Sequence, residues 1–280
     1  MKSYVMELKS FALTDVGPVR ENNEDCFFSA EISASCSDSV SFLPQGKTGL
    51  YILCDGMGGH QKGEVASFTI VNELKRLVTS LLLSPNLAYI DNFGELLAQA
   101  VKQANDEVLA INLSENIGID ERRMGTTVVM AVAVCGKIYI VHVGDSRCYL
   151  INNDSVEQLT EDHCLANQLL KLGVFKTQEE AFRARGAKAL TQAIGPREGK
   201  FLNPDVTVLD ATQGSYLILC SDGLTDVVSA EEIKKIVLSG KSNLKRITNK
   251  LIKTAYAKST SDNITIIAVK IVDSKVGSGE

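Results

Sequence analysis

The sequence predicts an α+β fold in which two antiparallel sheets lie at the centre and helices cover their outer faces. Three observations indicate this. Short apolar runs are separated by turn residues, two long segments carry apolar side chains at helical spacing, and strands and helices come in blocks instead of alternating. Strands in hairpin order argue against a doubly wound parallel sheet, whereas two sheets with helices outside bury every apolar face.

The expected elements follow from these periods. In order they are strands at 11–13, 26–28 and 51–54, helices at 64–83 and 93–113, strands at 126–134, 137–143, 147–151, 156–159, 206–209 and 216–220, helices at 230–238 and 243–257, and a last strand ending at 272. In the first helix the apolar positions are Val65, Phe68, Val71, Leu74, Leu77, Val78 and Leu81. We expect the first two helices to pack antiparallel because a short loop joins them.

The middle of the chain changes from helical to strand periodicity. Turn residues at Gly136, Gly144-Asp145 and 152–154 divide four strands, which is typical of an antiparallel meander. A polar, basic region then runs from Glu161 to Gly199 and contains short helical pieces. We expect one domain over 1–273 and a disordered tail over 274–280.

Bulk composition limits the possible functions. The chain has 280 residues, 45% of them hydrophobic and 22% charged, with a formal net charge of -5, which argues against nucleic acid as the main partner. No segment approaches about 18 uncharged apolar residues and the N-terminus lacks a signal-peptide pattern, so a soluble cytoplasmic protein is expected. The seven cysteines include no CxxC pair and are expected to be buried, without disulfides or zinc.

Four acidic residues stand at the ends of predicted strands: Asp55, Asp145, Asp222 and Asp262. Each one alone is more commonly a turn residue. If the strand ends meet, however, the carboxylates gather in one cleft. With no matching His/Cys cluster, such a cleft favours Mg²⁺ or Mn²⁺ over zinc. Two such ions can activate water and hold a phosphate.

The stretch from Arg20 to Asp25 adds an arginine that can grip a phosphate, followed by Glu24 and Asp25. At this point the chain resembles the metal-dependent Ser/Thr protein phosphatases of type 2C (the PPM family) in their bacterial form. The motifs that carry the resemblance are Arg20–Asp25, Asp55–His60, Met124–Thr127, Val143–Arg147, Leu159–His163, Leu190–Gly195, Ser221–Asp226 and Ser261–Asn263. They span the chain from Thr14 to about Val269.

The resemblance implies a four-layer α-β-β-α sandwich whose two central antiparallel sheets are flanked by pairs of antiparallel helices, with two Mn²⁺ or Mg²⁺ ions at one edge. It implies that Asp55 bridges both ions and that Arg20 holds the substrate phosphate. The remaining ligands of the pair would be the Gly56 carbonyl, Glu24 through water, Asp25, Asp222 and Asp262. A water or hydroxide activated at this centre would attack phosphorus directly, without a phosphoenzyme.

The same resemblance suggests roles for several other positions. Asp120 and Asp226, together with Asp222, match a third, weaker ion site of bacterial relatives. His60 is a candidate general acid for the leaving oxygen, although a lone histidine in a glycine-rich loop is more often structural or solvent-exposed, and metal-bound water could protonate the leaving group instead. His142 and His163 are interpreted as structural. The Gly-Asp-Ser-Arg turn at Asp145 is expected to support the edge of the sheet.

The basic region, at about 165–199, corresponds to the flap beside the active site of bacterial members. Its lysines and arginines either form a solvated helical face or contact phosphorylated protein. The candidates for such contact are Lys171, Lys176, Arg183 and Arg185.

The function expected from the resemblance is hydrolysis of phosphoserine and phosphothreonine in proteins by a monomer that opposes a cognate Ser/Thr kinase. Neither a membrane nor nucleic acid is expected as a partner. One alternative is a phosphatase for small phosphoesters. A second is a catalytically dead binding module on the same fold, which the complete set of ligand acids argues against.

Overall fold

The computed structural model describes residues 6–32, 48–58, 62–84, 92–114 and 123–273. In chain order the elements are β1 (Met6–Asp15), β2 (Asp25–Ile32), β3 (Thr48–Met57), α1 (Gly63–Leu82), α2 (Phe93–Ser114), β4 (Gly125–Thr126), β5 (Val128–Val134), β6 (Lys137–Val143), β7 (Arg147–Ile151), β8 (Val156–Gln158), α3 (Leu165–Lys171), α4 (Gln178–Arg183), η2 (Gly199–Phe201), β9 (Asp205–Asp210), β10 (Tyr216–Cys220), α5 (Asp222–Thr225), α6 (Ala230–Ser239), α7 (Leu244–Ala257) and β11 (Ile264–Asp273).

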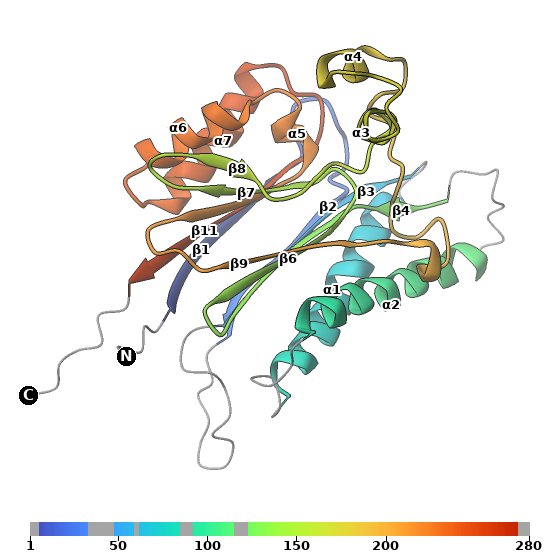
Figure 1. The fold of residues 1–280 in the computed structure, drawn as a ribbon, viewed down its shortest axis with the longest axis horizontal. Coiled ribbons are helices and arrows are strands. Elements are labelled where there is room, and N and C mark those ends of the chain that lie inside the picture. Colours follow the sequence, from blue (N-terminus) through green and yellow to red (C-terminus); the bar gives the residue numbers. More distant parts are fainter. Residues whose placement is uncertain (1–5, 33–47, 59–61, 85–91, 115–122, 274–280) are drawn as a thin grey trace, which may run out of the picture.

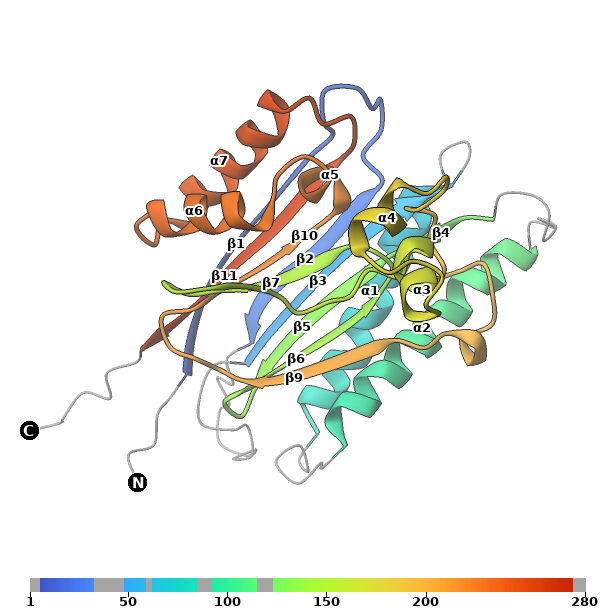
Figure 2. The ribbon, with the colours of Figure 1, turned by 45° about the horizontal axis from the view of Figure 1, so that its top comes forward.

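The strands form two antiparallel sheets. One has the order β1-β11-β10-β7-β8, and the other has the order β2-β3-β5-β6-β9 with the short β4 paired to β3. Helices α6 and α7 lie on one side of the pair of sheets and α1 and α2 on the other (Figures 1 and 2). The fold class expected from the sequence is therefore confirmed.

Successive side chains of each central strand point alternately toward the helices and toward the other sheet, and this explains the layered core. In β3, Leu50 and Ile52 pack with the residues of α1 and α2, whereas Tyr51 and Leu53 pack between the sheets. On β11 the even-numbered positions from 264 to 268 pack under α6 and α7, and the odd-numbered ones from 267 to 271 face the other sheet. Both faces of these strands are buried, which is why they appear in the sequence as unbroken apolar runs.

The residues that α1 buries at its N-terminal end differ from those predicted from the sequence. Val65 and Phe68 of α1 are exposed, at 42% and 62%, while Ala66, Ser67 and Ile70 are buried. Helical periodicity shows which apolar side chains lie along one face of a helix. The neighbouring elements decide which side chains at the edge of that face are buried. At its N-terminal end α1 turns its small residues inward, and the hydroxyl of Ser67 donates to the carbonyl of Glu24.

The prediction of a four-stranded meander is wrong in one respect: the four strands are divided between the two sheets. β5 pairs with β6 and β7 pairs with β8, but β7 joins β10 in the other sheet. The chain crosses between sheets at Gly144, whose φ of +108° is readily adopted only by glycine. The crossing places the Gly144-Asp145 turn at the edge where both sheets end.

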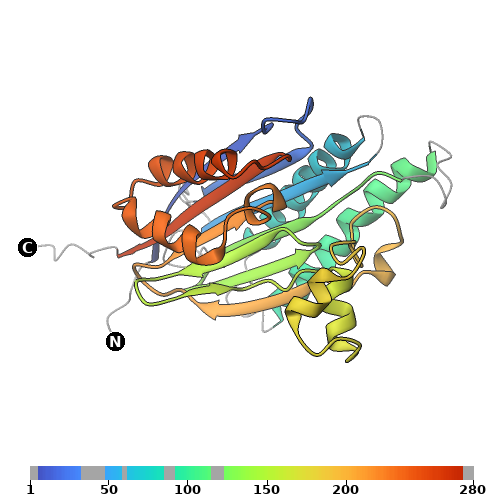
Figure 3. The same cartoon turned by 90° about the horizontal axis from the view of Figure 1, so that it is seen from above.

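Helices α3 and α4 belong to the segment 165–199, which we call the flap segment. They project from the rest of the protein, in yellow in Figures 1 and 3. The segment has a small core of its own, formed by Cys164, Ala166, Ala181 and Ala187 with neighbouring apolar side chains. Within the described ranges, no helix is long and apolar enough to cross a membrane, and the six cysteines are unpaired. The tail 274–280 and Cys36 lie outside these ranges.

Candidate metal centre

Two carboxylates face each other at the end of one sheet. Asp25, the first residue of β2, is paired with Asp55 of β3 in antiparallel register. Directly opposed side chains have Cβ atoms about 4.5–5.5 Å apart, a spacing at which like charges destabilise a sheet. Because Tyr51 and Leu53 point between the sheets, Asp55 continues that face at its open end. The pair therefore lies at the mouth between the two sheets.

Two further carboxylates come from neighbouring strands of the other sheet. Asp222 follows β10, Asp262 precedes β11, and these two strands are paired. The segments approach so closely that a Cβ atom on Gly223 would lie 2.0 Å from the backbone oxygen of Asn263. A larger residue at position 223 would push the two acids apart.

A serine hydroxyl connects Asp25 of one sheet to the backbone of the other sheet. Ser221 accepts a hydrogen bond from the Thr265 N–H at 2.9 Å and donates one to Oδ2 of Asp25 at 2.8 Å. Asp25 is only 9% exposed, so this hydroxyl sets the orientation of a buried carboxylate.

Glu24 lies against two glycines. The N–H of Gly56 donates to the Glu24 carbonyl at 3.1 Å, and a Cβ on Gly63 would lie 2.6 Å from Oε1 of Glu24. A Cβ on Gly56 would lie 2.3 Å from the Gly63 carbonyl oxygen. Only glycines allow the Asp55-Gly56 strand end, the start of α1 and Glu24 to meet here.

The loop that carries Arg20 is tied down by one asparagine. The Asn263 side chain accepts from the N–H of Glu24 at 2.8 Å and donates to the carbonyls of Val16 and Asn22 at 2.8 and 2.9 Å. These contacts fix the loop to the start of β11, beside Asp262. The loop therefore delivers Arg20 to the acid cluster.

Arg20 reaches the cluster directly. Its Nη2 donates to Oδ2 of Asp262 at 2.6 Å, while 49% of the side chain is exposed. Burial alone lowers the pKa of Arg20, but the bond to Asp262 and the charges of Asp262, Glu24 and Asp222 raise it above its ordinary value. The guanidinium is thus held at the site with part of its surface open to a ligand.

Burial of the clustered carboxyl groups and repulsion between their charges raise their pKa values. Burial raises the pKa of Asp55 well above its ordinary value, and the charges of Asp25 and Asp222 add to this. Burial also raises the pKa of Asp25 to about 7, and burial together with Asp226 and Asp262 raises that of Asp222 to about 6. So many carboxylates cannot all be ionised at neutral pH without cations among them.

The residues fit a pair of hard divalent ions. Oδ1 of Asp25 and Oδ1 of Asp222 are buried without a hydrogen-bond partner among the described residues. A buried carboxylate oxygen without a donor is costly unless a cation meets it. Oxygen donors without sulfur or imidazole are the ligand set of Mg²⁺ and Mn²⁺. The cluster is therefore a chemically consistent site for the ions expected from the sequence.

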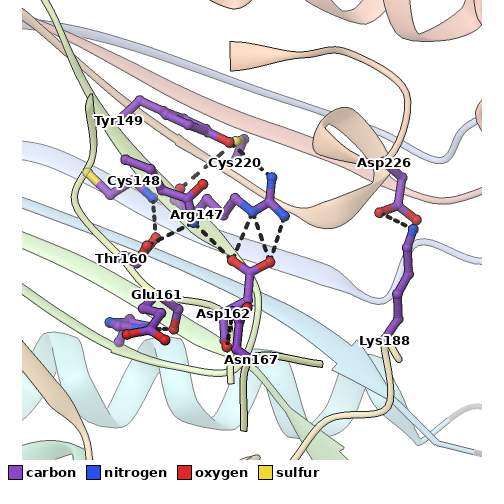
Figure 4. A network of polar contacts seen from close by, with 12 residues as sticks. Arg147, Cys148, Tyr149, Thr160, Glu161, Asp162, Asn167, Lys188, Cys220 and Asp226 are labelled. Carbon is purple, nitrogen blue, oxygen red and sulfur yellow. Dashed lines mark hydrogen bonds and ion pairs between the residues drawn. The ribbon is translucent and has the colours of Figure 1, made fainter. Parts of the chain in front are cut away.

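Two more acids border the cluster. Burial, with the charges of Asp222 and Asp162, raises the pKa of Asp145 to about 7. Asp226 lies one turn beyond Asp222, to whose carbonyl its N–H donates at 2.8 Å, and it forms an ion pair of 2.7 Å with Lys188 (Figure 4). Two other assigned residues, His60 and Asp120, lie outside the described residues.

The two remaining histidines form a separate cluster with Asp205. The rings of His142 and His163 are stacked with centroids 4.7 Å apart. Nδ1 of His163 accepts from the Gly144 N–H at 3.1 Å, so Nε2 of the neutral ring carries the proton and faces Asp205 at 3.2 Å. No lone pair of this ring is left for a metal. The cluster instead braces the Gly144-Asp145 turn, in agreement with a structural role.

Several supporting residues were not predicted from the sequence. Thr126 and Thr127 both bond the backbone of Asp55, at 2.8 to 3.1 Å. Ser221 and Asn263 orient Asp25 and the Arg20 loop. All four lie inside the motifs, but their polar side chains indicate a position near the site without indicating a partner.

The sequence model of the family described as "Protein phosphatase 2C" matches residues 10–264. The chain belongs to this family. The serine/threonine phosphatase stp of Listeria innocua is 34% identical over 92% of this chain and 93% of that protein.

Solved structures agree with this membership. The serine/threonine phosphatase PstP/Ppp of Mycobacterium tuberculosis aligns with a TM-score of 0.76 and 29% identity, over 96% of this chain and 100% of that one. A structure of the PstP catalytic domain in complex with two manganese ions aligns with a TM-score of 0.75 and 29% identity, over the same shares of the two chains. The family predicted from the sequence is therefore confirmed.

Proposed function

We propose that this protein hydrolyses phosphoserine and phosphothreonine in other proteins, with two Mn²⁺ or Mg²⁺ ions held at the mouth between its sheets. The observation that carries the proposal is the convergence of Asp25, Asp55, Asp222 and Asp262 beside Arg20. Membership of the phosphatase 2C family and the two manganese ions of the similar PstP structure support it.

Asp55 is the residue that would bind both ions. The Gly56 carbonyl, Asp25 and, through water, Glu24 would hold one of them, and Asp222 and Asp262 would hold the other. Such ions lower the pKa of water and neutralise the charge of a phosphate. Asp226 and Asp120 are assigned to a third, weaker ion.

The chain's own side chains bind and orient the substrate. Arg20 donates hydrogen bonds to the phosphate oxygens, and its bond to Asp262 holds the guanidinium at the edge of the cluster. Ser221 keeps Asp25 turned toward the mouth, and Thr127 fixes the backbone of Asp55. The donor of a proton to the leaving serine or threonine oxygen stays a hypothesis, with His60 as the candidate.

We infer that the enzyme is a cytoplasmic monomer that dephosphorylates the targets of a cognate Ser/Thr kinase. The phosphorylated kinase itself is the first protein substrate to test. A dead binding module is disfavoured because the ligand acids and Arg20 are all present.

The test compares substrates and metals on the full chain. Hydrolysis of a phosphothreonine peptide should require Mn²⁺ or Mg²⁺, stop in EDTA and return when metal is added. The same preparation should hydrolyse a phosphosugar far more slowly. Activity that persists in EDTA would contradict the two-metal centre, and faster turnover of the phosphosugar would favour the small-phosphoester alternative. The Asp222→Ala variant serves as the inactive control.

A further inference from the structure

A groove lies between α2 and the chain that follows the flap segment, and we call it the α2 groove. Its volume is about 600 Å³, and the described residues that line it are Leu109, Leu113, Arg123, Pro196, Arg197, Glu198 and Phe201. The short helix η2 lies beside the C-terminal half of α2 at this place (Figure 1). This lining includes neither Arg20 nor a ligand of the proposed pair of ions.

The wall formed by residues 195–199 is fixed to α2 by hydrogen bonds. Asn105 accepts from the Gly195 N–H at 2.7 Å and donates to the Arg197 carbonyl at 2.8 Å. Asp106 accepts from the Gly199 N–H at 2.9 Å. A Cβ atom on Gly199 would lie 2.5 Å from a backbone oxygen of α2, so this wall lies directly on the helix. The groove is therefore preformed, and little of the chain has to be ordered when a ligand binds.

The interior of the α2 groove is mainly apolar. Leu109 is buried, whereas Leu113 and Phe201 are 55% and 66% exposed, and Pro196 lines the same hollow. Two large apolar side chains from different segments thus leave much of their surface in water at one place, and covering that surface is favourable. Sites for small molecules typically have volumes of about 300–1,000 Å³ and apolar linings with a few polar groups. The α2 groove has these properties.

The charges at the edge of the α2 groove favour an anion. Arg197 is exposed, and its side chain forms no ion pair with a described residue. The guanidinium of Arg123 is held at the same loop, since its Nη1 donates to the Pro196 carbonyl at 2.9 Å. Glu198 has a cation of its own, because Lys200 lies 2.5 Å from its carboxylate. A carboxylate can accept two parallel hydrogen bonds from one guanidinium, so it is the anion that these side chains fit.

We propose that the α2 groove binds a small amphipathic carboxylate, whose apolar body covers Leu113 and Phe201 and whose carboxylate contacts Arg197. The volume favours a small molecule over a folded partner, because a stable protein interface buries about 1,200–2,000 Å² in total. The inference goes beyond the proposed function and does not depend on it, because the binding uses other residues.

The test compares octanoate with octanol, which has the same number of carbon atoms but no charge. Each is titrated into the metal-free full chain, and binding is followed by NMR of the leucine methyl groups. Exposed ion pairs contribute little, so octanoate should bind about two- to fivefold more tightly than octanol. Arg197→Gln should weaken octanoate binding by the same factor and leave octanol binding unchanged.

Three further variants separate the α2 groove from other positive sites. Arg183 is an exposed arginine that pairs with Glu179 at 2.5 Å, so Arg183→Gln should bind octanoate like the wild type. Arg20→Ala should do so as well, because the groove is separate from the proposed phosphate site. Leu113→Ser should weaken octanoate and octanol alike. No octanoate binding by the wild type, equal affinity in Arg197→Gln, or loss of binding in Arg20→Ala overturns the proposal.

The same spectra locate the ligand. Nuclear Overhauser effects should join the octanoate chain to the methyl groups of Leu109 and Leu113, which both line the α2 groove. Contacts confined to leucines outside the groove would overturn the proposal even if octanoate binds. Because the titration uses metal-free protein, its failure would leave the proposed phosphatase function standing, and a lack of phosphatase activity would leave the binding result standing.

Discussion

The Ser221 hydroxyl at the end of one sheet donates a 2.8 Å hydrogen bond to the Asp25 carboxylate at the start of a strand in the other. Its oxygen is already occupied by the Thr265 N–H, so its proton is directed at Asp25. A single hydroxyl therefore couples the relative position of the two sheets to the geometry of the proposed metal centre.

Replacement of Ser221 by Ala should weaken the centre without removing a ligand. Loss of a hydrogen bond that orients a metal ligand typically lowers metal affinity or activity by about 10- to 100-fold. We expect this decrease in Mn²⁺ affinity, measured by calorimetry. Ser239→Ala, at the end of α6, is the control, because among the described residues that hydroxyl bonds only the Ile236 carbonyl. Equal affinities for the two variants would show that Ser221 does not position Asp25.

Removal of Arg20 should mainly affect substrate binding. Arg20→Ala deletes the proposed phosphate donor but none of the metal ligands, so KM for a phosphopeptide should rise more than kcat falls. Steady-state kinetics at saturating Mn²⁺ measure both constants. Arg76→Ala, which removes an exposed arginine paired with Glu73 on α1, should change neither. A loss confined to kcat would contradict phosphate binding by Arg20.

Neutralising Asp55 should have opposite effects on the metal-free and metal-loaded proteins. Asp55→Asn removes a carboxyl group whose ionisation is opposed by burial and by the charges of Asp25 and Asp222, so the metal-free thermal midpoint should rise at pH 8. The rise in midpoint that Mn²⁺ gives the wild type should disappear, because the proposed ligand of both ions is lost. Thermal scans in EDTA and in Mn²⁺ measure both effects. A wild-type response to Mn²⁺ in this variant would contradict the role of Asp55.

The raised pKa values predict the pH dependence of stability. Burial raises the pKa of Asp25 from 3.8 to about 7, and that of Asp222 from 3.8 to about 6. Between pH 3.8 and about 7 the folded metal-free protein holds protons that the unfolded chain has lost. Its free energy of unfolding should therefore fall as pH rises through this range.

Denaturant unfolding in EDTA at several pH values measures this slope. Asp25→Asn removes one of the two groups and should flatten the decline. Mn²⁺ competes with the same protons, so the stabilisation by Mn²⁺ should weaken as pH falls. A metal-free stability that rises steadily from pH 4 to about 7, and is unaltered in Asp25→Asn, would contradict the assigned carboxylates.

Gly223→Ala should disrupt the approach of Asp222 and Asp262. The new Cβ would lie 2.0 Å from the Asn263 carbonyl oxygen, which requires the backbone to move. We expect a lower thermal midpoint and loss of Mn²⁺ binding. Gly214→Ala is a matched control, since its Cβ meets nothing within 4 Å and only the positive φ of 79° opposes it. Similar Mn²⁺ binding in the two variants would contradict the tight contact.

The strands were predictable where they are buried on both faces. β6, β7 and β10 begin and end at the predicted residues, because unbroken apolar runs bounded by Gly or polar residues leave little choice of limits. β1 was underestimated, since only 11–13 look like a strand, whereas pairing with β11 extends it from Met6 to Asp15. Long-range pairing supplies hydrogen bonds that no local pattern shows.

The acids of the proposed centre were recognisable in the sequence because each one stands next to a buried strand or within a family motif. Their partners were not. Ser221 and Asp25 are 196 positions apart, and Lys188 was one of several basic residues without any sign that it meets Asp226. Such contacts depend on how the sheets and the flap segment pack.

The sequence by itself therefore determined the family, the two-sheet architecture and the identity of the carboxylates, because apolar periodicity and motif residues are local properties. The tertiary structure decided where the strand succession divides between sheets, which face of α1 is covered, and which hydroxyl, glycine or ammonium meets each acid. Those relationships arise from close packing between segments distant in the chain, and only the folded backbone brings them within hydrogen-bonding distance.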